Sequence, residues 1–385
     1  MSWETVKLGD IAEFSNGVNF DKSAYSKGVK LIGVSDFGNR FSPDYASLDE
    51  IKKEVVRPTD YLLDGDMVFV RSNGNKELVG RCMLINKPTS LVTYSGFCIR
   101  TRLKDTSKYN PLFFTFLFKS VAFRKALTGT AIGANIQNLS QGRLSSCTVQ
   151  VPDFKTQQNI ADILYSYQSL IENNKKQIKL LEEAAQRLYK EWFVDLCFPG
   201  HETTPIIDGI PQGWRKDFVG NIIDKSYRSK QVMTADYLAE GKIPIIDQSR
   251  DFIAGYTDDE ETLVSLDKPI IVFGDHTRIL KYIQFPFAKG ADGTQLVVSK
   301  CENVPQALLY LSLLNVDLSN YHYARHFKYL KAEEIIIPTI EIATKFDYLV
   351  SPIFKKVQIL RDQTINAQQA RDRLLPKLMS GELEV

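Results

Sequence analysis

The amino-acid sequence predicts a mixed α/β protein: two globular domains separated by an antiparallel pair of long helices, with an internal pseudo-two-fold repeat. Two observations lead to this prediction, because similar motifs recur in both halves of the chain and each globular segment precedes a long segment of helical periodicity. The chain has 385 residues, of which 44% are hydrophobic and 24% charged. This composition is that of an ordinary globular protein with room for more than one core.

The repeat is marked by two pairs of motifs. Trp-x4-Leu/Val-Gly-x-Ile occurs at residues 3–11 and again at 214–222, an offset of 211 residues. Leu-x6-Val/Ile-Pro occurs at 144–152 and at 330–338, an offset of 186. Such long offsets indicate a duplicated domain, because solenoid repeats are much shorter. We therefore predict globular domains at 1–152 and 199–340, each followed by a helical segment, at 153–198 and 341–385.

Each helical segment carries a narrow apolar seam. Counting in alternate steps of four and three from Ile160, and again from Phe346, gives mostly apolar positions over more than four heptads. This spacing is typical of two helices that pack on each other, although two amphipathic helices lying on their own domains would also produce it. The residues expected in the helix pair are Ile171, Asn174, Ile178, Leu181, Leu188, Val357, Leu360, Ala367, Arg371 and Leu374.

The ends and the register of the helices can also be predicted. Ser351 and Pro352 suggest an N-cap and a first helical position, so the second long helix should begin there, after a short helix and a break. Residues 165–166 are the counterpart in the first half. Pro376 and Gly381 should end the second helix early. In an antiparallel pair centred near residues 178–181, Asn174 should lie opposite Arg371 in a polar layer that fixes the register.

Charge is distributed unevenly along the chain. The formal net charge is only +2, but residues 71–152 contain twelve Lys or Arg and two acidic residues. Residues 268–331 contain eight basic and four acidic residues. Two separate basic regions favour a protein that contacts a polyanion at two places. Chance clustering of surface charge is the alternative interpretation.

Motifs that would indicate an enzyme are missing from the sequence. It contains no P-loop, no dinucleotide-binding glycine motif, no nucleophile elbow and no His-Glu-x-x-His. We predict no catalytic residues and no metal site. The five Cys are widely spaced, and we see neither a signal peptide nor a membrane-length apolar run, so we expect a cytoplasmic protein that is not associated with a membrane. His322 and His326, four residues apart, could bind a metal, and residues 274–278 could hold a general base, but both interpretations are weaker than a polar surface loop.

Several loops are rich in side chains that can contact bases and phosphates. The first follows a strand-like segment, Met67–Val70, and contains Arg71, Asn73, Asn75 and Lys76. A second, Gly-rich loop spans residues 128–137. In the second half, the corresponding loops are 225–231, 247–250, 274–278 and 321–328. Amide and basic groups of this kind bind base edges and backbone phosphates, although any one of these loops could be an ordinary polar surface loop.

Taken together and in order, these motifs resemble the DNA-specificity subunit of type I restriction–modification systems. The resemblance covers essentially the whole chain. It includes Gln157-Gln-x-Ile-Ala-x-Ile-Leu164 before the first helix and Leu374-Leu-Pro-Lys-Leu-Met-Ser-Gly-Glu382 at the end of the second. In the second half, Phe273-Gly-Asp-His-Thr277 with Lys289-Gly-Ala-Asp-Gly293 resembles one recurrent subtype of recognition domain.

The resemblance implies two target-recognition domains, each recognising half of a split double-stranded DNA site through the major groove. It also implies two methyltransferase (modification) subunits as partners, and a translocating nuclease (restriction) subunit that the assembly can recruit. The chain itself would bind no cofactor, because S-adenosylmethionine and ATP would be bound by the partner subunits. Because the two domains differ, the site should be asymmetric, with a gap of fixed length set by the helices. A helix over residues 167–193 would be about 40 Å long, close to the ~34–36 Å of one turn of DNA.

We expect DNA contacts at nine positions: Arg71, Asn73, Asn75, Lys76, Gln248, Arg250, His276, Thr277 and Arg278. Two functions of other classes stay open at this point. A hydrolase could use a cluster of Asp275, His276 and Asp292, and would act without partners. A coiled-coil scaffold would bind only protein and would not shift duplex DNA in electrophoresis.

Overall fold

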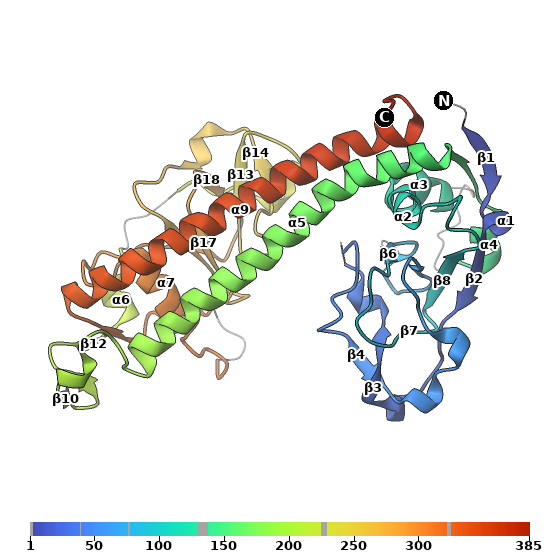
Figure 1. The fold of residues 1–385 in the computed structure, drawn as a ribbon. Helices are drawn as coiled ribbons and strands as arrows, with labels where there is room; N and C mark the ends of the chain where they lie inside the picture. The colour runs from blue at the N-terminus through green and yellow to red at the C-terminus, as the bar shows by residue number, and fades with distance from the viewer. Residues whose placement is uncertain (1–2, 39, 76–77, 129–137, 225–228, 322–324) are drawn as a thin grey trace. The chain divides into compact units, whose positions relative to one another are not determined.

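The computed structural model describes residues 3–38, 40–75, 78–128, 138–224, 229–321 and 325–385. The chain divides into two compact units. Unit 1 consists of residues 1–173 and 364–385, and unit 2 consists of residues 174–363. Two long helices, α5 (Phe154–Tyr189) and α9 (Ile340–Ser380), each contribute to both units (Figure 1).

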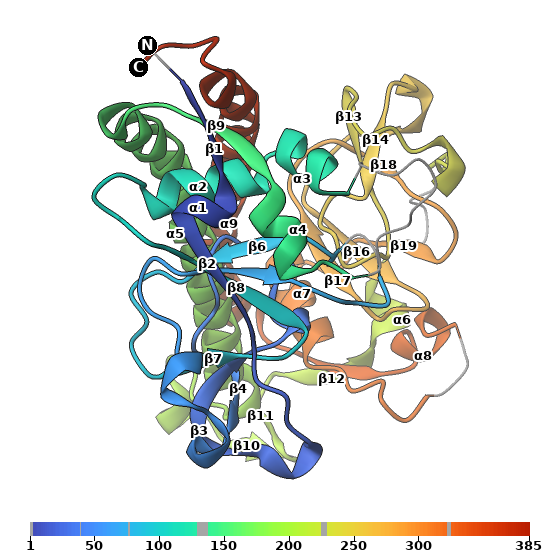
Figure 2. The same ribbon diagram turned by 90° about the vertical axis from the view of Figure 1, so that its right-hand side faces the viewer.

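Unit 1 is built on two small sheets and a terminal strand pair. Helix α2 (Pro111–Lys119) begins where the Asn110 side chain accepts hydrogen bonds from two backbone N–H groups, with Pro111 at the first helical position. The ring of Phe118 on this helix packs on Phe69 of strand β5 (Met67–Val70), with 5.2 Å between ring centroids, inside the main core of this unit. The terminal pair is β1 (Glu4–Lys7) with β9 (Thr148–Val151). One sheet has the order β2 (Ala12–Asn16), β8 (Cys98–Leu103), β5 (Met67–Val70), β6 (Cys82–Leu84) (Figure 2). The other has the order β4 (Asp49–Ile51), β3 (Tyr25–Ile32), β7 (Val92–Tyr94). The remaining helices are α1 (Leu8–Ile11), α3 (Val121–Thr128) and α4 (Gln141–Ser146).

Unit 2 has the same plan. Its terminal pair is β12 (Arg215–Phe218) with β20 (Glu334–Ile337). One sheet has the order β17 (Leu280–Ile283), β16 (Ile270–Gly274), β19 (Thr294–Val297). The other has the order β14 (Gly255–Thr257), β13 (Ile243–Ile246), β18 (Phe287–Lys289), β15 (Leu263–Val264). The helices are α6 (Val219–Ile222), α7 (Gln306–Leu314) and α8 (Phe327–Leu330), and a hairpin of β10 (Ile206–Ile207) and β11 (Ile210–Pro211) precedes them.

The strand pairing confirms the internal repeat. Glu4 pairs with Val151 in unit 1, and Arg215 pairs with Ile337 in unit 2, which reproduces the offsets of 211 and 186 residues. The order β8-β5-β6 recurs as β19-β16-β17. The order β4-β3-β7 recurs as β14-β13-β18, with one antiparallel and one parallel pairing in each case. The sequence motifs therefore mark equivalent structural positions, as predicted.

The antiparallel course of the helix pair is confirmed within each unit separately. In unit 1, Arg371 of α9 donates a hydrogen bond to Gln168 of α5, and Leu164 and Leu378 lie in one apolar cluster. In unit 2, Arg361 contacts Glu182 at 2.6 Å, and the ring centroids of Phe193 and Phe346 lie 4.9 Å apart. In both units, earlier residues of α5 therefore meet later residues of α9. Of the ten predicted packing positions, five are buried and five are half-buried; the buried ones are Ile171, Asn174, Val357, Leu360 and Ala367, and the others are Ile178, Leu181, Leu188, Arg371 and Leu374.

The predicted helix starts were wrong. Helix α5 begins at Phe154 and continues through residues 165–166, and α9 begins at Ile340 and continues through Pro352 and Pro376. Pro352 is tolerated because the backbone carbonyl that loses its hydrogen bond belongs to Tyr348, whose side chain is 80% exposed on the solvent side of the helix. Gly381, with φ of +74°, follows the last helical residue, so its predicted role at the helix end is confirmed.

The predicted polar layer was also wrong. The Arg371 guanidinium donates to Oε1 of Gln168 at 2.6 Å, whereas the amide nitrogen of the buried Asn174 has no hydrogen-bond partner in the described part of the chain. Gln168 lies one helical turn after Leu164, a fully buried residue of the apolar cluster. Apolar packing in unit 1 therefore fixes the register, and the seam pattern alone did not determine which polar residue Arg371 would meet.

Candidate nucleic-acid interface

The two main predicted loops occupy equivalent places in the two units. One follows β5, the other follows β16, and both strands lie at the centre of the three-strand arrangement that the units share. In unit 1 the Arg71 N–H donates to the carbonyl of Phe97, and in unit 2 the Asp275 N–H donates to the carbonyl of Gly293, at 2.8 and 2.7 Å. The sequence prediction therefore selected the same end of the same strand twice.

In unit 2, Gln248 joins two of the predicted loops, 247–250 and 274–278, to the segment 289–293. Its Nε2 donates to the backbone carbonyl of Asp292 at 2.8 Å, and its Oε1 accepts from the backbone N–H of His276 at 3.0 Å. Its own carbonyl accepts from the Thr277 hydroxyl at 2.8 Å. The structure thus brings together Gln248, His276 and Thr277, as predicted for one site. It also shows that both ends of the Gln248 amide hold the loops in place.

The two arginines predicted in unit 2 differ in their surroundings. Arg250 is exposed, at the end of the loop that begins with Gln248. Arg278 has a positive φ of +61°, and its Nη1 donates to the carbonyl of Leu318 at 2.9 Å. The side chain of His276 is exposed. Thr277 and Arg278 are exposed as well, and Arg278 in addition supports a neighbouring turn.

In unit 1 the predicted residues shape their own loop. The Arg71 guanidinium donates to the carbonyl of Gly96 at 3.2 Å, and Oδ1 of Asn73 accepts from the backbone N–H of Asn75 at 2.8 Å. Asn75 is exposed. Lys76 lies outside the described residues, as do residues 129–137, 225–228 and 322–324 of the other predicted loops.

Several cations of the basic stretch have structural contacts. Arg102 pairs with Asp66 at 2.6 Å, Arg100 is buried and donates to the carbonyl of Thr59, and Lys104 donates to the carbonyl of Gly9. Lys119 donates to two backbone carbonyls, and burial lowers the pKa of its ammonium group to about 8. The excess positive charge of residues 71–152 is therefore only partly available to a polyanion.

The geometry does not assemble the hydrolase cluster that the sequence left open. The Asp275 side chain is buried, and its Oδ1 accepts from the backbone N–H of Phe327 at 2.7 Å. Oδ1 of Asp292 accepts from the Gln231 amide. The ring of the buried His326 lies between the carbonyls of Asp275 and Tyr321, at 2.9 and 3.0 Å. These polar groups have structural partners, and among the described residues no group of three potential metal ligands occurs.

Sequence reasoning missed Phe97. Its side chain is 63% exposed at the turn between β7 and β8, directly beside the loop that contains Arg71. Ser95 and Gly96 before it indicate a turn between two strand-like segments, but a turn signal does not show which side chain is exposed for binding. The signal that could have located it is the repeat, because the equivalent turn in unit 2 is the glycine-containing segment 289–293.

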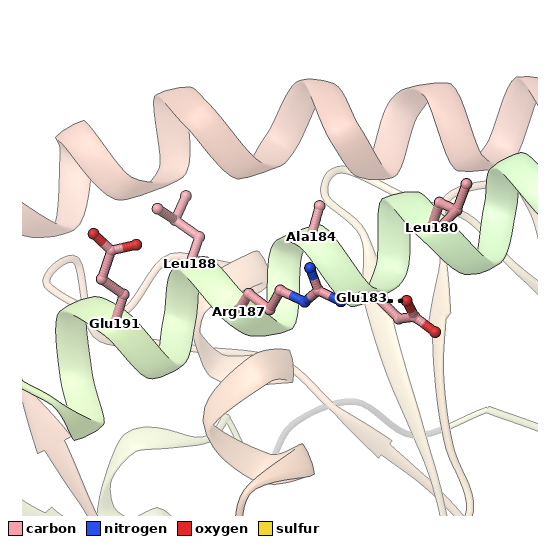
Figure 3. A pocket seen from close by; sticks show the side chains of 6 residues that line it. All are labelled: Leu180, Glu183, Ala184, Arg187, Leu188 and Glu191. Carbon is pink, nitrogen blue, oxygen red and sulfur yellow. Dashed lines mark ion pairs between the residues drawn. The ribbon is translucent and has the colours of Figure 1, made fainter.

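A shallow groove runs along α5 in unit 2 (Figure 3). Leu180, Ala184 and Leu188 line it and point to one side of the helix, with Leu180 64% exposed. Glu183 and Arg187 form an ion pair beside them, at 3.9 Å. The groove is therefore an apolar stripe bordered by charges. In the described part of the chain, none of the helices is long and apolar enough to cross a membrane.

Comparison with known proteins agrees with the resemblance seen in the sequence. Residues 1–183 match the family model of the type I restriction modification DNA specificity domain. Over 416 aligned positions the chain is 28% identical to the type I restriction enzyme MjaIX specificity subunit of Methanocaldococcus jannaschii, covering all of this chain and 94% of that protein. It is 26% identical to the HindI specificity subunit of Haemophilus influenzae, over 50% of this chain and 41% of that one.

The fold agrees with these sequence relationships. The crystal structure of the type I restriction–modification S subunit from M. genitalium superimposes with a TM-score of 0.60, covering 98% of this chain and 96% of that one at 15% identity. Both globular segments and both long helices of the present chain fall within that coverage. Residues 1–183 thus match the type I restriction modification DNA specificity domain, and the whole chain is similar in sequence to type I specificity subunits and in fold to an S subunit.

Proposed function

We propose that the chain recognises a split, asymmetric double-stranded DNA site, one half with each unit, and directs adenine methylation or restriction by partner subunits. The observation that carries this proposal is the repeated topology with different side chains at equivalent strand ends. After β5, unit 1 presents Arg71 and the neighbouring Phe97, whereas after β16, unit 2 presents His276 beside Gln248. Two copies of one fold with different loop chemistry favour two different half-sites.

The residues available in the loops suit recognition of base edges. Arginine pairs with guanine, asparagine and glutamine pair with adenine, and exposed cations contact phosphates. Arg71, Asn73 and Asn75 would act in unit 1, and His276, Thr277 and Arg250 in unit 2. Gln248 would act mainly by holding these loops, because both ends of its amide already bond to the protein. Thr277 and Arg278 each make one such bond and would combine this role with contacts to DNA.

Catalysis would be supplied by partners. We propose that two methyltransferase subunits bind S-adenosylmethionine, that a recruited restriction subunit binds ATP, and that this chain contributes sequence choice and no cofactor. The assembly would act in the cytoplasm. We also propose that the helices α5 and α9, which each contribute to both units, set the length of the non-contacted gap in the DNA site.

The groove on α5 is our proposed docking place for a methyltransferase subunit. Leu180 and Leu188 offer an apolar stripe on a helix, and Glu183 and Glu191 border it. Because Arg187 also lines the groove and pairs with Glu183, an amphipathic helix with an apolar face and flanking residues of both charges would fit this stripe. Leu180→Glu should abolish co-purification of the methyltransferase subunit. Leu263→Glu, at a residue that is 44% exposed on β15, is the matched control and should leave assembly intact.

Mapping of methylated adenines tests the proposed function directly. Cells that carry the partner subunits should be sequenced with and without this chain, using a method that detects N6-methyladenine. The expected result is one bipartite, non-palindromic motif that disappears without the chain. A palindromic motif, or a motif that persists in its absence, would reject the proposal.

A further inference from the structure

Phe97 is held rigidly at the surface of unit 1. Its backbone carbonyl accepts hydrogen bonds from the N–H groups of Arg71 and Ser72, at 2.8 and 3.3 Å. The preceding residue, Gly96, donates to the carbonyl of Val18 at 2.8 Å and accepts from the Arg71 guanidinium. Two other chain segments, around Val18 and around Arg71, therefore fix this turn while the phenyl ring stays 63% exposed. An aromatic ring of this kind can bury a large apolar area when another molecule binds, and the fixed backbone keeps the ring in one place.

The repeat shows what occupies the same place in unit 2. Phe97 corresponds to Gly293, because the carbonyl oxygen of each accepts a hydrogen bond from the first residue after the central strand. A Cβ atom at Gly293 would lie 2.7 Å from Nε2 of Gln248 and 2.7 Å from Cδ2 of His276. Unit 2 thus fills this position with the side chains of Gln248 and His276, whereas unit 1 places a phenyl ring there.

A second position in the repeat agrees with this contrast. Ser95 donates to the carbonyl of Ile32, and Gly290 donates to the carbonyl of Ile246, so these two isoleucines are equivalent. Two residues further along the chain, unit 1 has Val34 and unit 2 has Gln248. The place that is polar in unit 2 is therefore apolar in unit 1. The part of a DNA major groove that an apolar group recognises is the C5-methyl group of thymine.

We propose that Phe97 is a specificity-determining residue of unit 1, and that its ring contacts a thymine methyl group in the half-site bound by this unit. This inference rests on the proposed function. Insertion of the ring between base pairs is the other way in which an aromatic side chain acts on DNA, and it belongs to minor-groove binding with a bent duplex. The adjacent Arg71 and Asn73 carry the groups that pair with base edges in the major groove, so contact with a methyl group fits the surroundings better.

The test compares thymine with uracil, which differs only by this methyl group. The full chain, assembled with its methyltransferase partners, is titrated with duplexes that contain the mapped site, and each thymine in turn is replaced by uracil. For the wild-type protein, uracil at one position should weaken binding about three- to tenfold, as expected for loss of one buried methyl group. Phe97→Ala should weaken binding to the thymine duplex by a similar factor. Phe97→Ala should bind the thymine duplex and the duplex with uracil at that position with equal affinity.

Two further variants complete the design. Phe97→Leu keeps an apolar group and should recover part of the affinity for the thymine duplex. Leu63→Ala, at a residue of unit 1 that is 54% exposed, is the matched control and should bind both duplexes like the wild type. The variants remove exposed side chains only, so their melting curves should match that of the wild-type protein.

The outcomes separate this inference from the proposed function. If Phe97→Ala and every uracil substitution weaken binding independently, or if no uracil substitution weakens it at all, the contact with a methyl group is refuted while site-specific binding stands. Ring insertion is tested with duplexes that carry the fluorescent base 2-aminopurine within the half-site of unit 1. A fluorescence change on binding of the wild type that is lost in Phe97→Ala, with no effect of uracil on affinity, would show ring insertion and also refute the methyl contact. A complex that prefers no duplex would overturn the proposed function, and this inference with it.

Discussion

An ion pair between the two helices offers a quantitative test of how unit 2 is stabilised. Nη2 of Arg361 lies 2.6 Å from Oε1 of Glu182, and the two side chains are 21% and 34% exposed. The Arg361 guanidinium also lies 4.0 Å from the ring centroid of Phe252. Burial raises the pKa of Glu182, although the charge of Arg361 acts to lower it. Burial likewise lowers the pKa of Arg361, although the charge of Glu182 acts to raise it. Desolvation therefore exceeds the mutual attraction of the pair.

The expected magnitudes follow from this partial burial. Breaking a fully buried pair costs about 3–5 kcal/mol, and breaking an exposed one about 0–1 kcal/mol. Arg361→Met leaves the carboxylate of Glu182 unpaired at intermediate exposure, so we expect a loss of about 1–3 kcal/mol in the free energy of unfolding of unit 2. Glu182→Leu should cost less, because the guanidinium keeps its contact with Phe252. The double variant should lie close to the wild type, because no charge then remains buried.

Tryptophan fluorescence can report on unit 2 alone. Two of the three tryptophans, Trp192 and Trp214, lie in the core of unit 2 and are 6% exposed, and Trp3→Phe removes the third. Urea unfolding in this background measures the four members of the double-mutant cycle. Lys345→Met is the control, because Lys345 and Glu341 of α9 lie 2.7 Å apart but are 50% and 72% exposed, and we expect no measurable change. Additive losses, with the double variant as unstable as the sum of the single ones, would refute the reasoning.

Three further predictions concern charge and length. Burial lowers the pKa of Lys281 from 10.5 to about 8, so the folded state favours the neutral amine. Relative to Lys281→Met, wild-type unit 2 should therefore gain stability as the pH rises from about 8 to 10.5 and lose it as the pH falls through 8. Urea unfolding of both proteins measures this, and stabilities that change in parallel with pH would contradict it. Arg250→Ala should weaken binding to all duplexes alike and reduce the slope of log K against log salt concentration by about one, whereas a change of preferred bases would show a base contact instead. The third prediction inserts four residues after position 173 and four after position 363, where each helix passes from one unit to the other. Both half-sites should be preserved, and the gap between them should lengthen by about two base pairs. Four residues add ~6 Å at ~1.5 Å per residue, and one base pair spans ~3.4 Å. Methylation mapping of the insertion variant should show this, and altered half-sites with an unchanged gap would reject it.

The architecture was largely predictable because the chain contains its repeat in two complete copies. Two motif offsets of 211 and 186 residues correspond to the terminal strand pairs of both units. The helical seam was equally clear, since a period of 3.5 residues over many turns is produced by few structures besides helices that pack along a seam. The start of α9 was not predictable from Ser351 and Pro352. Whether a proline interrupts a helix depends on where the freed carbonyl points, and that is known only once the exposed face of the helix is known.

The site was predicted in part. The loops after the two central strands were located correctly, and Gln248, His276 and Thr277 do come together. The sequence did not show that Gln248 uses both ends of its amide within the protein, because those bonds join segments about 30 to 45 residues apart. Phe97 was missed because a single aromatic residue between two strand-like segments has no distinctive pattern. Its position became informative only through its structural counterpart, Gly293.

The contacts of the basic residues indicate which subunits of the assembly should supply the affinity for DNA. A protein that holds DNA by itself needs many cations free to displace counterions, and the affinity then falls steeply with salt. In this chain, Arg100, Arg102 and Lys119 instead bind carbonyls or a carboxylate of the protein itself, and the net charge is only +2. The side chains that distinguish the two units, Phe97 in one and His276 in the other, are suited to choosing a sequence more than to holding a phosphate backbone. It follows that most of the salt-dependent affinity of the assembled complex should come from its partner subunits, while this chain contributes the difference in affinity between the right DNA sequence and the wrong one.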